Sequence, residues 1–348
     1  MKGSTSRVAV VGPTNWGTTL SIMLGRKGDE VRLLARTGDE AERLNRDREN
    51  AAHLPGFPFP RAVRATASVE EALAGAAMVI LAVPAQSMRD TVKQLSRHLD
   101  RSMLLLSVAK GLELDSAKRM SEIVPEEIDP AMHPNVCVLS GPNLAKEIAR
   151  GLPATTVIAA RDESVATRAQ KMMASPLFRV YVNTDVTGVE LGGVLKNVIA
   201  MAAGMVDGLG YGDNTKGALM SRGLAEITRL GVAAGANPLT FAGLAGLGDL
   251  VATCSSPLSR NRFVGQELAK GRPLKEIIST MAGTAEGVTT TVAALRLAAG
   301  LSVEMPITEQ VYRVLYKGLD VRTGVAELMG RELKHEFADI LGSATTDP

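Results

Sequence analysis

The chain has 348 residues, 45% of them apolar and only 3% aromatic, and its 39 basic and 37 acidic residues leave a formal charge of +2. That length and apolar content suffice for more than one core, so two domains are expected. The near-balanced charge, without a dense basic run, argues against nucleic acid as a partner. With so few aromatic residues, small side chains must fill the cores, which favours tightly packed helices.

The first residues, MKGSTSRVAVVG, hold an apolar strand that is too brief for a signal-peptide core, so a cytoplasmic protein is expected. The longest apolar runs, such as residues 76–85, fall well short of the ~20 residues that span a bilayer, and no membrane span is expected. Cys137 and Cys254 have no motif spacing, as in a reducing compartment, and the 4 histidines form no ligand pattern. No metal site is therefore expected.

Short apolar strands alternate with helical stretches through the first half of the chain. The expected strands cover residues 7–11, 31–35, 78–83, 103–108 and 136–140, with further short ones at 154–159 and 179–182. This alternation is typical of a parallel doubly wound sheet. After Asp185 the strand pattern ends, and a long helical pattern with an apolar stripe takes over. The sequence predicts an α/β fold, with a Rossmann-type dinucleotide-binding domain over residues 1–185 and an all-α substrate and catalytic domain over residues 186–348.

The loop after the first strand departs from the dinucleotide fingerprint G-x-G-x-x-G. Gly12 and Gly17 occupy the first and last glycine positions, whereas Thr14 replaces the middle glycine and Pro13 removes a backbone donor. Thr14 would either crowd the pyrophosphate or replace a contact through its hydroxyl. The sequence leaves both alternatives open.

The end of the second strand bears on the choice of cofactor. NAD-specific folds place an acid there for the ribose hydroxyls, whereas this chain has Leu34, Ala35 and Arg36. A cation suits a 2′-phosphate, so NADPH is expected to be preferred and NADH to be the alternative. The competing interpretation is that Arg36 begins a polar loop and that Asp39 or Glu40 reaches a ribose.

Lys196 lies in a row of very small residues on the first long helical pattern. Gly192, Ala200 and Ala203 share its line on the helix, and that row can admit a ligand or another helix closely. A lysine with such neighbours can lose solvation and exchange a proton. The alternative is an ordinary solvent-facing lysine. The expected charge partner is Asp249, which a glycine precedes.

The triplet Ser259, Arg260 and Asn261 lies where a loop is expected to enter a helix. Side chains and free backbone N–H groups at such a place can converge on a phosphate. The alternative is an ordinary helix start, with Ser259 as the cap and Arg260 in solvent. The nearby Asp249 favours the phosphate site.

Nine motifs, taken in their order and spacing, resemble the bacterial NAD(P)-dependent glycerol-3-phosphate dehydrogenases from about Arg7 to Glu336. They are VAVVGPTNWGTTL (8–20), NAAHLPGFPFP (50–60), LAVPAQ (81–86), AKGLE (109–113), LSGPNLAKEIARGLP (139–153), GVELGGVLKNVIAMAAGM (188–205), GLAGLGDLVATCSSPLSRNR (243–262), AEGV (285–288) and MPIT (305–308). The chain departs from the family's usual G-A-G-S-W-G at residues 12–17. It also departs from the usual serine and phenylalanine at Asn143 and Leu144.

The resemblance implies reversible reduction of dihydroxyacetone phosphate to sn-glycerol 3-phosphate, which supplies glycerophospholipid synthesis, in a homodimer. Lys196 would protonate the developing alkoxide, Asp249 would orient that lysine, and Lys110 would polarise the carbonyl. The implied substrate contacts are Lys110, Gly141, Asn143, Lys196, Asp249, Ser259, Arg260 and Asn261. The implied cofactor contacts are Gly12, Asn15, Trp16, Gly17, His53, Lys110, Ala145, Arg260 and Glu286. Arg36 is a further expected cofactor contact, because of its position after the second strand.

Two other interpretations stay open at this point. One is a dehydrogenase of related architecture acting on another hydroxy compound, which would not need the Ser259–Arg260–Asn261 triplet. The other is a non-catalytic nucleotide-sensing protein, to which the altered loop at residues 13–15 would point. The presence of Lys110, Lys196 and Asp249 together favours the enzyme. The small, polar tail at residues 342–348 is expected to be disordered.

Overall fold

The computed structural model describes residues 6–281, 283–333 and 336, so the predicted disorder of residues 342–348 lies outside the described residues. The chain divides into two compact units. One consists of Met1–Lys110 and Lys118–Val189, and the other of Gly111–Ala117 and Glu190–Pro348.

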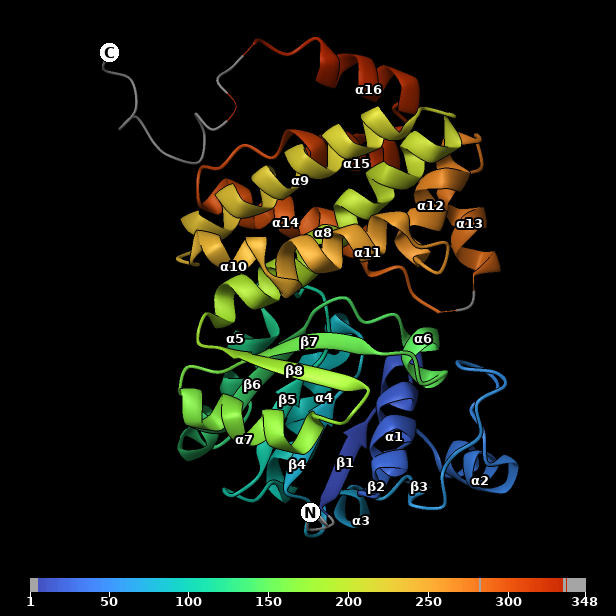
Figure 1. Ribbon diagram of the computed structural model, residues 1–348, viewed down its shortest axis with the longest axis vertical. Coiled ribbons are helices and arrows are strands. Elements are labelled where there is room, and N and C mark those ends of the chain that lie inside the picture. Colours follow the sequence, from blue (N-terminus) through green and yellow to red (C-terminus); the bar gives the residue numbers. More distant parts are fainter. Residues whose placement is uncertain (1–5, 282, 334–335, 337–348) are drawn as a thin grey trace. The chain divides into compact units, whose positions relative to one another are not determined.

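The first unit is built on one eight-stranded sheet with the order β3-β2-β1-β4-β5-β6-β7-β8 (Figure 1). Its strands are β1 (Arg7–Val11), β2 (Glu30–Leu34), β3 (Val63–Thr66), β4 (Met78–Leu81), β5 (Leu104–Ser107), β6 (Val136–Ser140), β7 (Ala154–Ala159) and β8 (Phe178–Asn183). Neighbouring strands pair in parallel, except that β6 and β7 are antiparallel. The strand order changes direction at β1, and such a switch point is where open α/β sheets bind ligands.

The predicted α/β class is confirmed, with corrections to the strands. The sequence prediction missed β3, a four-residue edge strand with an exposed arginine in its middle. It also placed the ends of β2, β4, β5 and β8 one or two residues away from where they lie. The predicted parallel doubly wound sheet holds for every neighbouring pair of strands except β6 and β7, which are antiparallel.

Helices cover both faces of this sheet because successive residues of its central strands are buried on opposite sides. Val8 and Val10 of β1 belong to one apolar core, whereas Ala9 and Val11 belong to another. The first core includes residues of α1 (Asn15–Lys27), α2 (Gly38–Asp47) and α7 (Glu163–Met173). The second includes residues of α3 (Val69–Leu73), α4 (Met88–Leu95) and α5 (Met120–Glu126). The short helix α6 (Ala145–Ala149) packs near α1.

The described residues of the second unit form helices and the loops that connect them, and no strand is found among them. Its helices are α8 (Val186–Gly208), which begins in the first unit, α9 (Asp213–Ala233), α10 (Pro238–Ala242), α11 (Asp249–Ser255), α12 (Arg260–Ala269), α13 (Leu274–Thr280), α14 (Glu286–Gly300), α15 (Pro306–Lys317) and α16 (Val321–Met329). A π-helical turn, Leu244–Gly248, leads directly into α11. The change from strands to helices after Asp185, where α8 begins one residue later, is confirmed.

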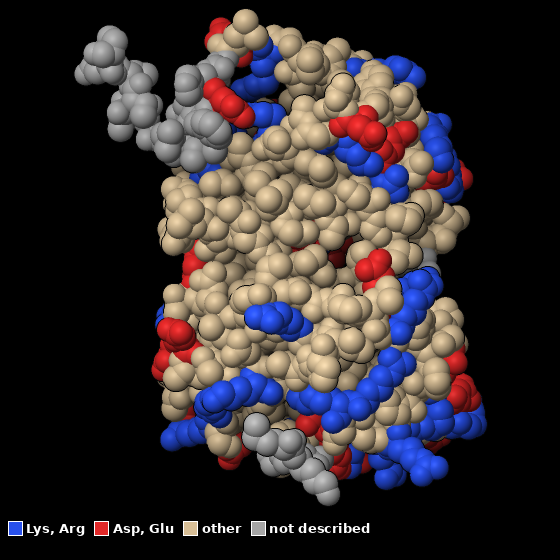
Figure 2. All heavy atoms as spheres, in the orientation of Figure 1, with Lys and Arg blue, Asp and Glu red and all other residues tan. Residues whose placement is uncertain are grey.

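Helix α8 supplies much of the core of the helical unit. The residues of its predicted apolar stripe are buried, as are its neighbours from α9, α12 and α14. In the part of the chain that the structure describes, α8 is the one helix long and apolar enough to cross a membrane. The length of uninterrupted apolar runs did not indicate it, because polar residues interrupt the apolar residues of α8. The whole apolar window of α8 is nevertheless buried inside the structure, as expected for a core helix. On the face drawn in Figure 2, most of the basic side chains gather over the first unit, with uncharged and some acidic side chains among them.

Candidate active site

The loop between β1 and α1 needs glycine at two of its three fingerprint positions. Gly12 has φ 99°, and a Cβ added there would lie 2.9 Å from Cγ1 of Val83. A Cβ on Gly17 would lie 2.1 Å from the carbonyl oxygen of Gly12. The middle position has φ −70°, which any residue adopts, so Thr14 causes no backbone strain there.

Thr14 is the N-cap of α1. Its Oγ1 accepts from the backbone N–H of Gly17 at 3.1 Å and donates to the carbonyl oxygen of Ala82 at 2.8 Å. The single proton of the hydroxyl is therefore directed to the end of β4. The sequence left open whether Thr14 crowds the pyrophosphate or replaces a contact through its hydroxyl. In the structure the Thr14 hydroxyl has another role, because it binds the loop to the sheet and caps α1.

The start of α1 has the features of an anion site. Its first turn holds no acidic residue, and free N–H groups at a helix N-terminus attract negative charge. Oδ1 of Asn15 and Nε1 of Trp16 are buried there without a protein hydrogen-bond partner. Asn50, which sequence reasoning did not single out, donates to the carbonyl oxygen of Pro13 and to the Thr18 hydroxyl, both at 2.8 Å. The loop is thus held in place while some of its polar atoms stay unmatched.

Arg36 follows β2 on an exposed turn. Its guanidinium is bound by both carboxylate oxygens of Glu40, with Nη2–Oε1 at 2.9 Å and Nε–Oε2 at 3.2 Å. The hydrogen bonds from Arg36 are the main reason that the pKa of Glu40 is lowered, although burial of the carboxyl opposes them. The Arg36 side chain is 75% exposed, so it presents a cation to solvent, and Glu40 faces that cation rather than standing alone.

Three further predicted cofactor contacts lie on different elements. His53 lies in the turn after α2, where its backbone N–H donates to the carbonyl oxygen of Asn50 at 3.1 Å. Ala145 is the first residue of α6, and its carbonyl oxygen accepts from the hydroxyl of Thr19 on α1 at 3.4 Å. Glu286 is the first residue of α14 in the helical unit. The structure therefore brings Ala145 next to α1.

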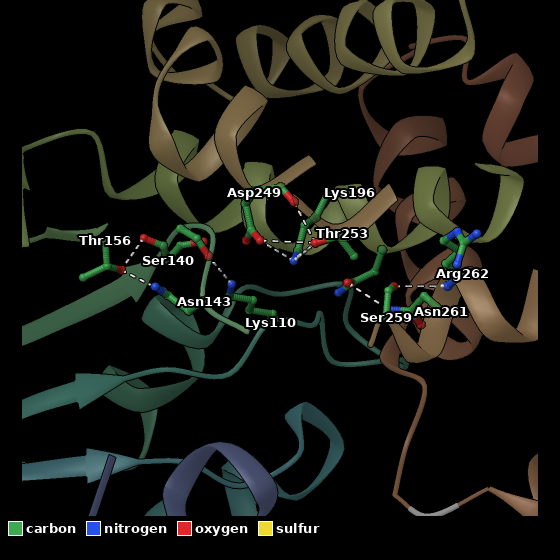
Figure 3. Close-up of polar contacts among 12 residues, drawn as sticks. Lys110, Ser140, Asn143, Thr156, Lys196, Asp249, Thr253, Ser259, Asn261 and Arg262 are labelled. Carbon is green, nitrogen blue, oxygen red and sulfur yellow. Dashed lines mark hydrogen bonds and ion pairs between the residues drawn. The ribbon is translucent and has the colours of Figure 1, made fainter. Parts of the chain in front are cut away.

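Lys110 and Gly141 meet at the carboxyl ends of adjacent strands. Nζ of Lys110, which follows β5, donates to the carbonyl oxygen of Gly141, which follows β6, at 2.9 Å (Figure 3). Oδ1 of Asn143 lies 2.9 Å from Oγ1 of Thr156, and its Nδ2 donates to the carbonyl oxygen of Thr155 at 3.3 Å. The Asn143 amide is thus bound to β7. The lysine stands at the sheet edge where ligands of α/β folds bind.

The helical unit buries Lys196 against Asp249 and Thr253 (Figure 3). Its Nζ donates to Oδ1 of Asp249 at 2.5 Å and to Oγ1 of Thr253 at 2.6 Å, and Oγ1 of Thr253 donates to the Asp249 carbonyl oxygen at 2.6 Å. The side chains of Lys196 and Asp249 are only 8% and 2% exposed. The solvent-facing alternative for Lys196 is wrong. Sequence reasoning missed Thr253, although its position one turn after Asp249 on α11 was a signal.

The row of small residues on α8 explains how Asp249 reaches the lysine. A Cβ on Gly192 would lie 2.6 Å from the carbonyl oxygen of Ala245, so only glycine lets the π-helical turn approach α8 this closely. That turn ends at Gly248, directly before Asp249. The row therefore admits a helical segment, which delivers the carboxylate to Lys196.

The Ser259–Arg260–Asn261 triplet forms the start of α12. Oγ of Ser259 accepts from the backbone N–H of Arg262 at 3.2 Å, so Ser259 is a helix cap, as the plainer interpretation expected. Arg260 is exposed, and its Nη1 lies so close to Gly283 that a Cβ there would be 2.3 Å away. Burial lowers the pKa of the Arg260 guanidinium, and the charge of Glu286 opposes that shift.

Asn261 points into the protein and joins three helices. Its Nδ2 donates to Oδ1 of Asn197 on α8 at 2.9 Å, and its Oδ1 accepts from the backbone N–H of Gly287 on α14 at 3.0 Å. Asn197 was missed from sequence, since its role depends on a residue 64 positions away. The amide of Asn261 thus holds the start of α12 in place beside the residue that follows Lys196.

Neither a metal site nor a reactive thiol is found among the residues that the structure describes. No group of three or more His, Cys, Asp or Glu side chains there could hold a metal ion. Cys137 and Cys254 are free and buried, and burial raises the pKa of each thiol to about 12.

Comparison with known proteins finds relatives along nearly the whole chain. The family model described as NAD-dependent glycerol-3-phosphate dehydrogenase N-terminus matches residues 7–166, and the corresponding C-terminus model matches residues 185–326. The chain is 53% identical over 334 residues to a glycerol-3-phosphate dehydrogenase (NAD(P)+) of Dehalococcoides mccartyi, covering 96% of this chain and 93% of the relative. A protein of the same name from Desulfitobacterium hafniense is 45% identical over 335 residues, covering 96% and 94%.

Comparison with solved structures finds the same family. The crystal structure of glycerol-3-phosphate dehydrogenase from Coxiella burnetii is similar with a TM-score of 0.89 and 34% identity, covering 94% of this chain and 99% of that one. A PanE/ApbA family ketopantoate reductase from Ralstonia eutropha, at 15% identity and a TM-score of 0.56, shares the fold alone.

Proposed function

This chain belongs to the NAD-dependent glycerol-3-phosphate dehydrogenase family, and we propose that it reduces dihydroxyacetone phosphate reversibly to sn-glycerol 3-phosphate with NAD(P)H. The reaction supplies the glycerol phosphate from which glycerophospholipids are made. The observation that carries the proposal is the buried Lys196–Asp249–Thr253 cluster. A lysine side chain that is 8% exposed and is held by a carboxylate and a hydroxyl is suited to acid–base work on a carbonyl.

The β1–α1 loop fits a bound dinucleotide. Gly12 and Gly17 leave no room for side chains, the start of α1 favours an anion, and Asn15 and Trp16 offer buried polar atoms without protein partners. When bound, NAD(P)H supplies the hydride that the ketone carbon receives. We propose that Gly12, Asn15, Trp16 and Gly17 bind the cofactor together with Ala145, which lies beside α1. The further proposed cofactor contacts are Arg36, His53, Lys110, Arg260 and Glu286.

The protein groups supply position and protons. Lys196 gives a proton to the oxygen of the ketone as its carbon is reduced, and Asp249 orients the ammonium and stabilises its charge. Thr253 supports the same Nζ from one turn further along α11. Lys110, held by the Gly141 carbonyl oxygen, polarises the carbonyl of the substrate.

The start of α12 is assigned to the substrate phosphate. Arg260 supplies a cation there, and the first N–H groups of the ten-residue helix add to its attraction for an anion. Ser259 and Asn261 shape this end of the helix, one as its cap and the other through the Asn197 amide. Asn143 and Gly141 are proposed as substrate contacts in the sheet-containing unit.

Arg260→Ala should raise KM for the phosphorylated substrate and leave kcat little changed, if the contact is equal in ground and transition states. An unchanged KM would place the phosphate elsewhere.

NADPH is proposed as the preferred reductant. The exposed Arg36 cation suits the 2′-phosphate of the adenosine ribose, and both oxygens of the nearby Glu40 are engaged by that arginine. Arg36→Ala should lower kcat/KM for NADPH by about 10-fold or more, the usual effect of losing a hydrogen bond to a charged group, and leave NADH turnover little changed. Wild-type kinetics that clearly favour NADH would refute this preference.

The decisive experiment follows cofactor oxidation with dihydroxyacetone phosphate and with unphosphorylated dihydroxyacetone. Turnover that depends on the phosphate supports the proposal. If the enzyme instead reduces the ketone form of another hydroxy compound, it is a related dehydrogenase. If it binds the cofactor but turns over no substrate, it is a sensor. Lys196→Ala should lower kcat by at least ~10², the usual size of general acid catalysis. Lys270→Ala, which removes an exposed lysine of the same unit, is the matched control.

Three assignments complete the proposal. Residues 1–185 act as the dinucleotide-binding domain and residues 186–348 as the catalytic domain. The enzyme works as a homodimer, which light scattering on the purified protein tests. It works in the cytoplasm, and the free, buried thiols of Cys137 and Cys254 suit that reducing compartment. Cell fractionation checks the location.

A further inference from the structure

A partly buried ion cluster lies beside the start of α12 and has no part in the chemistry assigned so far. Asp207, in the last turn of α8, accepts from Nε of Arg262 at 2.6 Å. The same carboxylate accepts from Nζ of Lys216 on α9 at 2.8 and 3.0 Å. The three side chains are only 16–18% exposed. One carboxylate thus binds two cations from two other helices.

The backbones of α8 and α12 touch along the same stretch. A Cβ on Gly204 would lie 1.9 Å from the carbonyl oxygen of Arg262, and a Cβ on Gly265 would lie 1.9 Å from the carbonyl oxygen of Met201. Gly208 would meet the Gln266 carbonyl oxygen at 2.6 Å in the same way. Contact this close between two helices needs glycine on both, and it leaves little freedom for sliding.

The start of α12 is therefore attached to α8 at two separate points. One is the hydrogen bond from Asn261 to Asn197, next to Lys196, and the other is the ion pair of Arg262 with Asp207. Lys196 and Asp207 are eleven residues apart on one helix, which is about 16 Å along its axis. Because Asn261 and Arg262 are both anchored, the direction in which the preceding Arg260 leaves the helix is set.

From this arrangement we propose that Asp207 and Arg262 are positioning residues, which hold Arg260 at the separation from Lys196 that one phosphorylated substrate spans. The proposal rests on the function assigned above to Lys196 and Arg260. Neither Asp207 nor Arg262 touches the substrate.

The test compares three kinetic quantities for Asp207→Asn and the wild type. They are kcat/KM for dihydroxyacetone phosphate, kcat/KM for unphosphorylated dihydroxyacetone, and the inhibition constant of inorganic phosphate. Only the first substrate must reach Arg260 and Lys196 at once. We expect its kcat/KM to fall by about 10- to 100-fold, the effect of misplacing bound groups by about 1 Å, while the other two quantities stay within about 3-fold. Glu304→Gln, which removes an exposed carboxylate paired with Arg331 in the same unit, should change none of them.

Other results would overturn the inference. An unchanged kcat/KM for dihydroxyacetone phosphate in folded Asp207→Asn would show that the ion pair does not position Arg260. A parallel loss of phosphate inhibition or of dihydroxyacetone turnover would show general damage instead. If Asp207→Asn does not fold, Arg262→Gln leaves Asp207 paired with Lys216 and must give the same selective loss. Wild-type turnover that ignores the phosphate group would refute the proposed function itself, a separate outcome that is seen before any variant is compared.

Discussion

Replacing Asp249 by asparagine tests the Lys196 cluster most directly, because the side chain keeps its shape and loses its charge. The lysine and the carboxylate are 8% and 2% exposed and lie 2.5 Å apart, so water cannot take over the role of the missing charge. Removing one partner of a buried ion pair costs about 3–5 kcal/mol. For a domain of this size each kcal/mol lowers Tm by about 2–4 °C, so a loss of about 4 kcal/mol lowers it by about 8–16 °C. We expect kcat to fall by about 10²-fold or more at the same time.

Calorimetry and steady-state kinetics on the same preparation measure the two effects. A second variant separates them: Lys196→Met combined with Asp249→Leu removes both charges, and apolar replacement of a buried pair is often neutral for stability. Thr253 keeps its hydrogen bond to the backbone of residue 249 in that variant. We expect a Tm near that of the wild type and no turnover. The reasoning is refuted if Asp249→Asn shifts Tm by less than about 2 °C, or if the double variant keeps activity within about 10-fold of the wild type.

Three further predictions concern folding and reactivity. Thr14→Ala should destabilise the protein by about 1 kcal/mol in urea unfolding through loss of the α1 cap, whereas Thr14→Ser should not; equal losses would contradict the cap. Glu226→Ala should cost about 3 kcal/mol or more, because the buried carboxylate accepts three hydrogen bonds at the start of α15, and Glu226→Gln should cost less. Cys137 and Cys254, whose pKa burial raises from 9.0 to about 12, should resist thiol reagents at about pH 8 until the protein unfolds. Since the folded-state pKa is the higher one, their contribution to stability is present below pH 9.0 and is lost as the pH rises towards about 12, which unfolding measured against pH checks.

Local sequence patterns were sufficient for the central sheet and for the fold class. The ends of β1, β6 and β7 were predicted at the residues where they lie, because buried strands read as short apolar runs between turn residues. The edge strand β3 was missed because two of its four residues are polar or charged, and only pairing with β2 makes it a strand. The direction of β7 against β6 depends on how the chain returns to the sheet, which no periodicity records.

The chemistry divides in the same way. The sequence by itself determined which residue types were available: a lysine in a row of small residues, an aspartate after glycine, and a serine–arginine–asparagine triplet at a helix start. Only the tertiary structure decided that Lys196 is buried against an aspartate 53 residues away, that Thr253 joins them, and that Asn261 faces inward. The physical reason is that the residue type alone sets the charge and the hydrogen-bonding groups of a side chain. Its burial, in contrast, depends on which helices pack together, and here glycine residues allow the close contacts between them.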